Sequence, residues 1–450
     1  MRPHSFAAAG PAASGGTSTE GRPDPEADSA PTRAPKSVFR YARLSATAAS
    51  VADAGPNTDS RGDAEAAAPS PGTGSGADGR LSFYIPSLAV GGAEQVTVSI
   101  VNGLVARGHD VDLVVSHPEG ELRSAVADDV SVTGLGSTRV PVAGIGAHVP
   151  ALARYLSRTE PAAVFAQKLD AGTVCLAANR LAGGDTKVIP TIHSAFGMAS
   201  ERTAKSRALD AFAARILASA DHVVAVSEGV ADSVAEATSV EREDVSVLHN
   251  PVDVESVRER SREPVDDTWV EYDDVDLVLF VGRLERQKDL ETWLRTFERV
   301  HRSNPDARAI IAGKGSRRER LRSRAIELGL DGVVSIPGYV DNPYRYMRNA
   351  DVFLLSSRFE GLPTVLIEAL ACGCQVVATD CPCGPREILR SGEYGRLAPV
   401  GDAEGLAREV EKSLSDPIPP ERLEGRADEF APEVVLNEYE RFIDAYVFGR

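Results

Sequence analysis

The chain has 450 residues, 42% of them apolar, and carries 66 acidic side chains against 49 basic ones, which gives a formal net charge of −17. This length exceeds that of one ordinary domain and supplies enough apolar residues for two cores. So acidic a chain excludes a sequence-independent nucleic-acid binder, because such proteins bind mainly by placing cations on phosphates. We therefore expect no nucleic-acid partner.

Only seven of the basic residues are lysines. An acidic, lysine-poor surface suggests a halophilic protein in a salt-rich cytoplasm, where salt screens the repulsion between like charges. The five cysteines are an odd number in a long chain and favour a reducing compartment. Because the sequence has no signal-peptide core and no run of about 20 apolar residues, we expect a cytoplasmic location. A peripheral contact with the inner face of the cell membrane stays open.

The composition changes near residue 80. Residues 1–79 are rich in Ala, Gly, Pro, Ser and Thr and are predicted to be a disordered, low-complexity segment. Beyond it, short β-branched runs alternate with helical stretches, as in βα units around a parallel sheet. Strands are expected at 81–86, 111–116, 162–166, 187–193, 222–227 and 245–249, and then at 275–282, 307–313, 333–338, 351–357 and 375–380.

This series of elements predicts an α/β protein with two doubly wound, Rossmann-like domains, over residues 80–250 and 251–430. An acidic stretch that runs to about residue 274 is expected to be a linker between the two strand series. The stretch 434–447 has apolar residues at helical spacing and needs a surface to cover. We assign residues 431–450 to a C-terminal helix that returns to the first domain.

The densest polar motif lies in residues 356–389, where Glu360 and Glu368 are eight positions apart. Glu360 ends the loop after an apolar strand, and residues 361–364 open a helix whose free amides would attract phosphate. Eight helical residues span about 12 Å, so the two carboxylates are not an adjacent acid–base pair. They could instead bind different hydroxyl-bearing parts of one extended ligand. The alternative is that Glu368 is an ordinary exposed helix residue.

Two further loops follow predicted strands of the second domain. GRLERQKD (282–289) holds Arg283 and Lys288, a guanidinium and an ammonium that together suit a diphosphate, although a solvated basic loop is the alternative. AGKGS (312–316) has two glycines that permit close approach of a ligand or form a tight turn. This segment lacks the spacing of a dinucleotide fingerprint and the ending of a P-loop.

Taken together, these motifs resemble the retaining glycosyltransferases of family 4, which have the GT-B fold of two facing Rossmann-like domains. The resemblance covers roughly residues 81–447. It implies that Arg283 and Lys288 hold the diphosphate of a nucleotide sugar. It further implies that Glu360 lies beside the donor sugar and that Glu368 bonds the ribose.

The same resemblance implies roles for backbone amides after Glu360, for the loop Gly91-Gly92, which would face the diphosphate and the acceptor, and for His193 near the reacting centre. A hydrogen-bonded structural residue is the alternative for His193. The candidate catalytic residues are Arg283, Lys288, Glu360 and His193, and the candidate donor-binding residues are Gly91, Gly92, Gly313, Gly361, Leu362, Thr364 and Glu368.

No metal site and no cofactor are expected. The aspartates at 110, 112, 274 and 276 form two DxD triplets at predicted strand entrances, opposite the ligand side, and are interpreted as solvated charges. Two CxC pairs between residues 372 and 383 have donors that zinc accepts. The first pair lies at a helix-to-strand turn where the family often has small residues, so zinc is disfavoured.

The resemblance implies transfer of a hexose or N-acetylhexosamine from a UDP- or GDP-sugar to a hydroxyl of a glycan or lipid-linked acceptor. A non-catalytic carbohydrate- or nucleotide-sugar-binding module and a sugar-nucleotide epimerase are the alternatives. A nicotinamide dehydrogenase is disfavoured because no strand leads into GxGxxG. Residues 201–219 are compatible with a basic amphipathic helix on anionic lipid or with a helix that covers the sheet.

Overall fold

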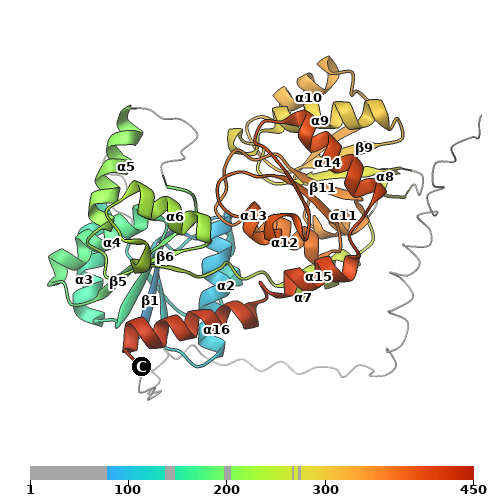
Figure 1. The fold of residues 1–450 in the computed structure, drawn as a ribbon. Coiled ribbons are helices and arrows are strands. Elements are labelled where there is room, and N and C mark those ends of the chain that lie inside the picture. Colours follow the sequence, from blue (N-terminus) through green and yellow to red (C-terminus); the bar gives the residue numbers. More distant parts are fainter. Residues whose placement is uncertain (1–78, 137–146, 197–203, 266–267, 272–274) are drawn as a thin grey trace, which may run out of the picture. The chain divides into compact units, whose positions relative to one another are not determined.

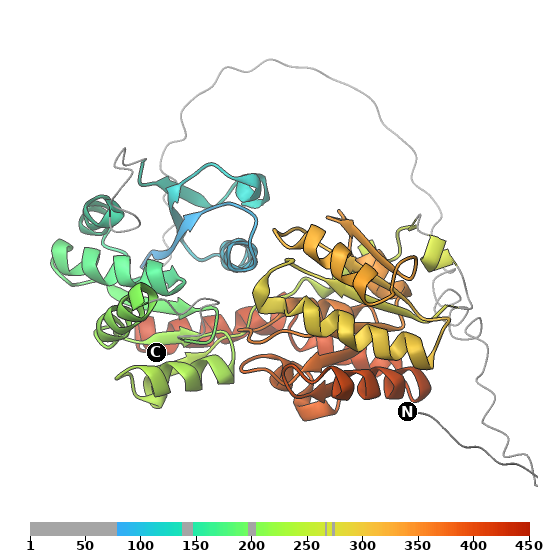
Figure 2. The ribbon, with the colours of Figure 1, turned by 90° about the horizontal axis from the view of Figure 1, so that it is seen from above.

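The computed structural model describes residues 79–136, 147–196, 204–265, 268–271 and 275–450. Residues 1–78 lie outside the described part of the chain. The disorder predicted for residues 1–79 therefore concerns residues that, apart from residue 79, the structure does not describe. The described residues form two parallel sheets with helices packed around them, which confirms the expected α/β class (Figure 1). Each sheet is built from one continuous stretch of sequence, blue to green in the first half and yellow to red in the second (Figure 2).

The first sheet has the strand order β3-β2-β1-β4-β5-β6-β7, and all its pairs are parallel. The order reverses between β1 and β4, which is the position where open α/β sheets bind ligands. The strands are β1 (Leu81–Ser87), β2 (Val111–His117), β3 (Ser131–Gly134), β4 (Ala163–Gln167), β5 (Lys187–Ile192), β6 (Val223–Ala225) and β7 (Val245–Val247). The helices are α2 (Gly92–Ala106), α3 (Val149–Thr159), α4 (Leu169–Ala182), α5 (Ala204–Leu217) and α6 (Glu228–Ala237).

The second sheet, of order β10-β9-β8-β11-β12-β13, is also parallel and reverses between β8 and β11. Its strands are β8 (Leu277–Val281), β9 (Arg308–Ala312), β10 (Val334–Gly338), β11 (Val352–Leu355), β12 (Gln375–Thr379) and β13 (Arg396–Ala398). The helices of this part of the chain are α7 (Val254–Ser261), α8 (Thr268–Glu271), α9 (Leu290–Ser303), α10 (Arg318–Glu327), α11 (Tyr344–Asn349), α12 (Thr364–Ala371), α13 (Pro385–Ile388), α14 (Ala403–Ser415) and α15 (Pro420–Asp428).

Every strand expected from the sequence is present, and the structure adds the short edge strands β3 and β13. The stretch between the two strand series, expected to be a linker, contains helix α7, which the sequence did not predict. Its N-cap Asp253 accepts a hydrogen bond of 2.9 Å from the backbone N–H of Ser256, and Val254 and Val257 are buried. Capping and an apolar face therefore stabilise a helix within an acidic stretch.

Two of the four aspartates at the strand entrances, Asp112 and Asp276, are buried, so the interpretation as solvated charges is wrong for them. Asp110 is exposed, as expected, and Asp274 lies outside the described residues. The carboxylate of Asp112 accepts hydrogen bonds from the hydroxyl of Tyr155 at 2.6 Å and from Thr133 Oγ1 at 3.0 Å. Asp276 accepts one from Asn304 Nδ2 at 2.6 Å. Because buried carboxylates need such partners, these residues tie strands to their neighbours at the end of the sheet away from the ligand side.

The C-terminal helix α16 (Pro432–Phe442) packs on the first half, beside α2, as expected (Figure 1). Leu436 and Tyr439 are buried in the same core as residues of β1, β2 and β4. A Cβ at Gly103 of α2 would lie 2.4 Å from Leu436 Cδ1, so glycine permits the close packing of these two helices. An ion pair of 2.6 Å between Arg107 and Glu440 joins them at the surface.

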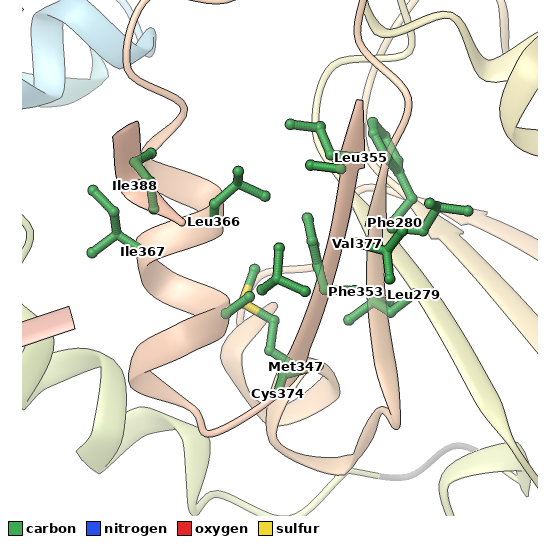
Figure 3. Close-up of a cluster of buried hydrophobic side chains, with 14 of the residues drawn as sticks. Leu279, Phe280, Met347, Phe353, Leu355, Leu366, Ile367, Cys374, Val377 and Ile388 are labelled. Carbon is green, nitrogen blue, oxygen red and sulfur yellow. The ribbon is translucent and has the colours of Figure 1, made fainter. Parts of the chain in front are cut away.

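The core of the second half positions helix α12. Leu366 lies on the side of α12 that faces Phe353 and Leu355 of β11, and Phe280 of β8 packs in the same core (Figure 3). All four side chains are completely buried. This packing sets the start of α12 directly beside the carboxyl end of β11, where the polar motifs lie.

We predict that Tyr439→Ala lowers the free energy of unfolding by about 3 kcal/mol, because it leaves a cavity where a fully buried ring packs. Val434 lies on the same helix and is 42% exposed, so Val434→Ala should change stability by about 0.5 kcal/mol or less. Urea unfolding measures both values. Equal effects of the two substitutions would contradict the packing of α16 on the first half.

Candidate active site

The polar loops of the second half meet where the strand order reverses. Residues 282–288 follow β8 and residues 356–361 follow β11, and these strands are neighbours in the sheet. The carboxyl ends of parallel neighbours lie at the same edge, so the two loops come together although about 70 residues separate them in sequence.

A buried ion pair joins these two loops. Lys288 Nζ lies 2.6 Å from Glu360 Oε1, and the two side chains are 12% and 7% exposed. Ser357, completely buried, donates its hydroxyl to the same carboxylate oxygen at 2.5 Å. Two charge-assisted contacts therefore fix the Glu360 carboxylate, as a buried charge requires.

Gln287, which no sequence motif marked as a candidate, connects the pair to Arg283. Its amide nitrogen donates to the carbonyl of Phe359 at 2.9 Å and to Glu360 Oε2 at 3.3 Å. Its amide oxygen accepts from Arg283 at 3.5 Å, and Arg283 is otherwise exposed. The expected candidates Arg283, Lys288 and Glu360 thus form one connected group, with a guanidinium facing solvent.

The AGKGS loop packs directly on the loop after β8. A Cβ at Gly313 would lie 1.8 Å from the carbonyl oxygen of Gly282, and a Cβ at Gly315 would lie 2.5 Å from that of Leu284. The backbone N–H of Leu284 also donates to the carbonyl of Lys314 at 2.8 Å. Both glycines serve this contact between loops, which supports the tight-turn alternative; a role of Gly313 in donor binding stays a prediction.

Helix α12 begins next to Glu360, with Pro363 as its N-cap and Thr364 as its first residue. Glu368 is half-buried one turn further on. Burial raises the pKa of its carboxyl to about 7, and a hydrogen bond with Thr364 and the charge of Arg260 only partly oppose this rise. Glu368 is therefore not the ordinary exposed helix residue of the alternative interpretation. Water does not fully solvate this carboxylate, and the hydroxyl groups of a bound ligand could donate the missing hydrogen bonds.

The first half has its own group of charged residues where its strand order reverses. Glu94, in the first turn of α2, folds back toward Gly91, since a Cβ there would lie 2.3 Å from Glu94 Oε2. The carboxylate forms an ion pair with Lys168, the residue that follows β4. Lys168 has a φ of 85°, a conformation that few non-glycine residues adopt. The Gly91-Gly92 loop thus borders a buried carboxylate and a cation.

His193 follows β5, and its ring nitrogen Nε2 lies 2.8 Å from Gln167 Oε1, at hydrogen-bond distance. Burial and then the charge of Lys168 lower the pKa of His193 to about 4. The imidazole is therefore neutral near pH 7, which suits a hydrogen-bonding group better than a cation for phosphate.

Backbone contacts connect the His193 segment to the segment of Glu360. A Cβ at Gly361 would lie 2.0 Å from the carbonyl oxygen of His193, so any other residue there would displace one of these segments. The carbonyl of Gly361 accepts a hydrogen bond of 3.0 Å from the buried hydroxyl of Ser227. These contacts place His193, a candidate of the first half, next to Gly361 and Glu360, candidates of the second half.

The cysteines are free thiols, and Cys372, Cys374 and Cys381 are buried. Burial raises the pKa of the Cys381 and Cys383 thiols to about 12. Within the described ranges, no three His, Cys, Asp or Glu side chains are grouped so that they could hold a metal ion. Every helix in this part of the chain is too short or too polar to cross a lipid bilayer.

The two sheets of this strand order, with polar loops at both reversal points, define a protein of the GT-B fold. Residues 90–256 match the family described as Glycosyltransferase Family 4, and residues 261–430 match the one described as Glycosyl transferases group 1. Together these two matches span most of the described chain, and they identify it as a glycosyltransferase of the family 4 type, as its motifs predicted.

Two relatives come from Campylobacter jejuni. The chain is 28% identical over 371 residues to GalNAc-alpha-(1->4)-GalNAc-alpha-(1->3)-diNAcBac-PP-undecaprenol alpha-1,4-N-acetyl-D-galactosaminyltransferase, a match that covers 81% of this chain and 94% of the relative. It is also 30% identical over 199 residues to N-acetylgalactosamine-N,N'-diacetylbacillosaminyl-diphospho-undecaprenol 4-alpha-N-acetylgalactosaminyltransferase. That match covers 44% of this chain and 52% of the relative. The chain thus spans about half the length of several curated relatives that it matches.

Solved structures share the fold. The structure of Anabaena HepE in complex with UDP-glucose has a TM-score of 0.68 and 18% sequence identity, and the match covers 82% of this chain and all of that one. Similarity at this level of identity concerns the arrangement of the elements, and it agrees with the two sheets described above.

We predict that UDP binds more weakly to the chain as the pH falls through 7. The raised pKa of Glu368 means that the carboxyl is ionised above about 7 and protonated below it. Its ionised fraction falls about tenfold between pH 8 and pH 6, and a protonated carboxyl accepts hydrogen bonds from a ribose less well. Titration calorimetry at several pH values measures the affinity.

Glu368→Gln should bind UDP weakly at both pH values and abolish this pH dependence, whereas Glu404→Gln, a change at an exposed side chain of α14, should preserve it. A dependence that persists unchanged in Glu368→Gln would contradict the prediction.

Proposed function

We propose that the chain is a retaining glycosyltransferase that moves a hexose or N-acetylhexosamine from a UDP- or GDP-sugar to a hydroxyl of a glycan or lipid-linked acceptor. The observation that carries the proposal is the connected group of Arg283, Gln287, Lys288 and Glu360 at the reversal point of the second sheet. It offers cations and a fixed carboxylate at the edge of the sheet where ligands of this fold class bind.

The charges of this group suit a departing diphosphate. Arg283 is exposed and has no ion pair among the contacts described, so its guanidinium can bind two phosphate oxygens. Lys288 is already neutralised by Glu360, and it can share its remaining N–H groups with the same phosphates. Both would stabilise the negative charge that develops on the diphosphate as its bond to the sugar breaks. Because these cations serve the diphosphate, we propose that transfer needs no metal.

The acceptor would bind to the first half, near Gly91, Gly92 and His193. Two relatives carry names with an undecaprenol diphosphate-linked glycan, which supports a lipid-linked acceptor here. A protein that uses such an acceptor would work in the cytoplasm at the inner face of the membrane. Phe212 of α5 is 57% exposed and is our candidate for the peripheral membrane contact.

A sugar-binding module without catalysis and a sugar-nucleotide epimerase remain the rival functions. The ordered Lys288–Glu360 pair favours catalysis, because a module needs no buried carboxylate beside the donor sugar. An epimerase would convert the donor when no acceptor is present, whereas a transferase would release only free nucleotide and sugar by slow hydrolysis.

We predict that Arg283→Ala lowers turnover of the nucleotide sugar at least a hundredfold, since a positioned cation contributes on this scale. The side chain is exposed, so the melting temperature should change little. The matched control is Arg302→Ala, which removes a 72% exposed arginine at the far end of α9. Nucleotide release measures turnover. Equal turnover in wild type and Arg283→Ala would refute the assignment of the diphosphate site.

Assays with UDP- and GDP-sugars, with and without EDTA, test the reaction class and the metal requirement. We expect one nucleotide sugar to raise the melting temperature, EDTA to leave turnover unchanged, and the product to keep the anomeric configuration of the donor. NMR of the product determines that configuration. Inversion would contradict the retaining mechanism, and loss of turnover in EDTA would contradict the metal-free one.

A further inference from the structure

Gln167 is the last residue of β4 and is completely buried, at the point where the first sheet reverses its order. Neither the sequence motifs nor the proposed diphosphate site gives it a role. A buried amide is costly unless its oxygen and its nitrogen find partners, so the partners of Gln167 indicate why a polar residue ends this strand.

The amide of Gln167 lies between Thr191, on the neighbouring strand β5, and His193. The two residues are register partners in the parallel pair β4–β5, and Gln167 Nε2 donates to Thr191 Oγ1 at 3.4 Å. The amide oxygen lies on the opposite side of the group, 2.8 Å from His193 Nε2. An amide oxygen can only accept, so the proton of the neutral imidazole lies on Nε2.

The surroundings keep this imidazole neutral. Lys168, the residue after Gln167, brings a positive charge close to the ring, and its ion pair with Glu94 holds that charge in place. Burial and the charge of Lys168 both lower the pKa of His193, as described above. A neutral ring with its proton on Nε2 has a lone pair on Nδ1, and among the described residues no protein group is found donating to it.

We propose that Gln167 is a positioning residue that holds His193 as the Nε2–H tautomer, so that Nδ1 is presented as a hydrogen-bond acceptor to a hydroxyl of the sugar substrate. This inference rests on the proposed function for the identity of the substrate, although the tautomer itself does not depend on it. The lone pair on Nδ1 attracts a hydroxyl and repels phosphate or carboxylate oxygens. His193 thus selects a sugar hydroxyl and serves neither as a general acid nor as a phosphate ligand.

Nitrogen NMR of the protein labelled with [15N]histidine tests the tautomer without any substrate. The chain has eight histidines, and a spectrum of His193→Asn identifies the signals of His193 by their loss. At pH 7 we expect His193 to show a protonated Nε2 and an unprotonated Nδ1. A protonated Nδ1 in the wild-type protein would overturn the proposal, and this measurement needs no further variant.

Two substitutions then test the part of Gln167. Gln167→Met keeps the approximate volume and removes the acceptor, so the Nε2–H tautomer should lose its dominance. Gln167→Glu keeps an acceptor oxygen at the same position and should keep Nε2 protonated. The matched control is Asn179→Leu, which removes another buried amide of the first half, bonded to the carbonyl of Thr186 at 2.7 Å. It should leave the His193 signals unchanged.

In transfer assays we expect Gln167→Met to lower kcat about tenfold to a hundredfold, by analogy with the loss found when a group that orients a metal-bound histidine is removed. Donor KM should change much less. An unchanged tautomer in Gln167→Met would refute the positioning role even if activity fell. A wild-type chain with the Nε2–H tautomer and no transferase activity would instead refute the proposed function and leave the positioning of His193 intact.

Discussion

The buried ion pair between Lys288 and Glu360 is the constraint on which the candidate site depends. Removing two charges from water is costly, and the cost is recovered only when the partners meet at close range with further hydrogen bonds. Ser357 and Gln287 supply those bonds. The loops after β8 and β11 therefore have one favourable arrangement, and Arg283 takes its position from it.

Both halves have an ion pair between the loops at the reversal point, but the lysine and the glutamate occupy opposite loops in the two halves. In the second half the lysine follows the first strand of its sheet and the glutamate follows the fourth; in the first half Glu94 follows β1 and Lys168 follows β4. Each pair bridges the loops at a reversal of strand order. A polar side chain lies near each pair: the exposed guanidinium of Arg283 in the second half, and the neutral imidazole of His193 in the first.

The sequence predicted the interior strands and the charged residues of the site, because long β-branched runs and the Arg283–Lys288 and Glu360–Glu368 spacings are local signals. It missed β3 and β13, which are too short to show a pattern, and helix α7, whose apolar residues are few. Asp112 was misinterpreted as solvated because its partners lie 21 and 43 residues away. Gln287 and Gln167 escaped notice for the same reason: an amide gains its role only from what folding brings beside it.

The return of α16 to the first half has a consequence for biosynthesis. Domains generally fold in the order in which they leave the ribosome. Here the core formed by β1, β2 and β4 also contains Leu436 and Tyr439, which are synthesised after the whole second half. The half that is made first therefore completes its core last. Until α16 packs, the apolar side chains of this core that contact Leu436 and Tyr439 lack their cover, and uncovered apolar surface favours aggregation.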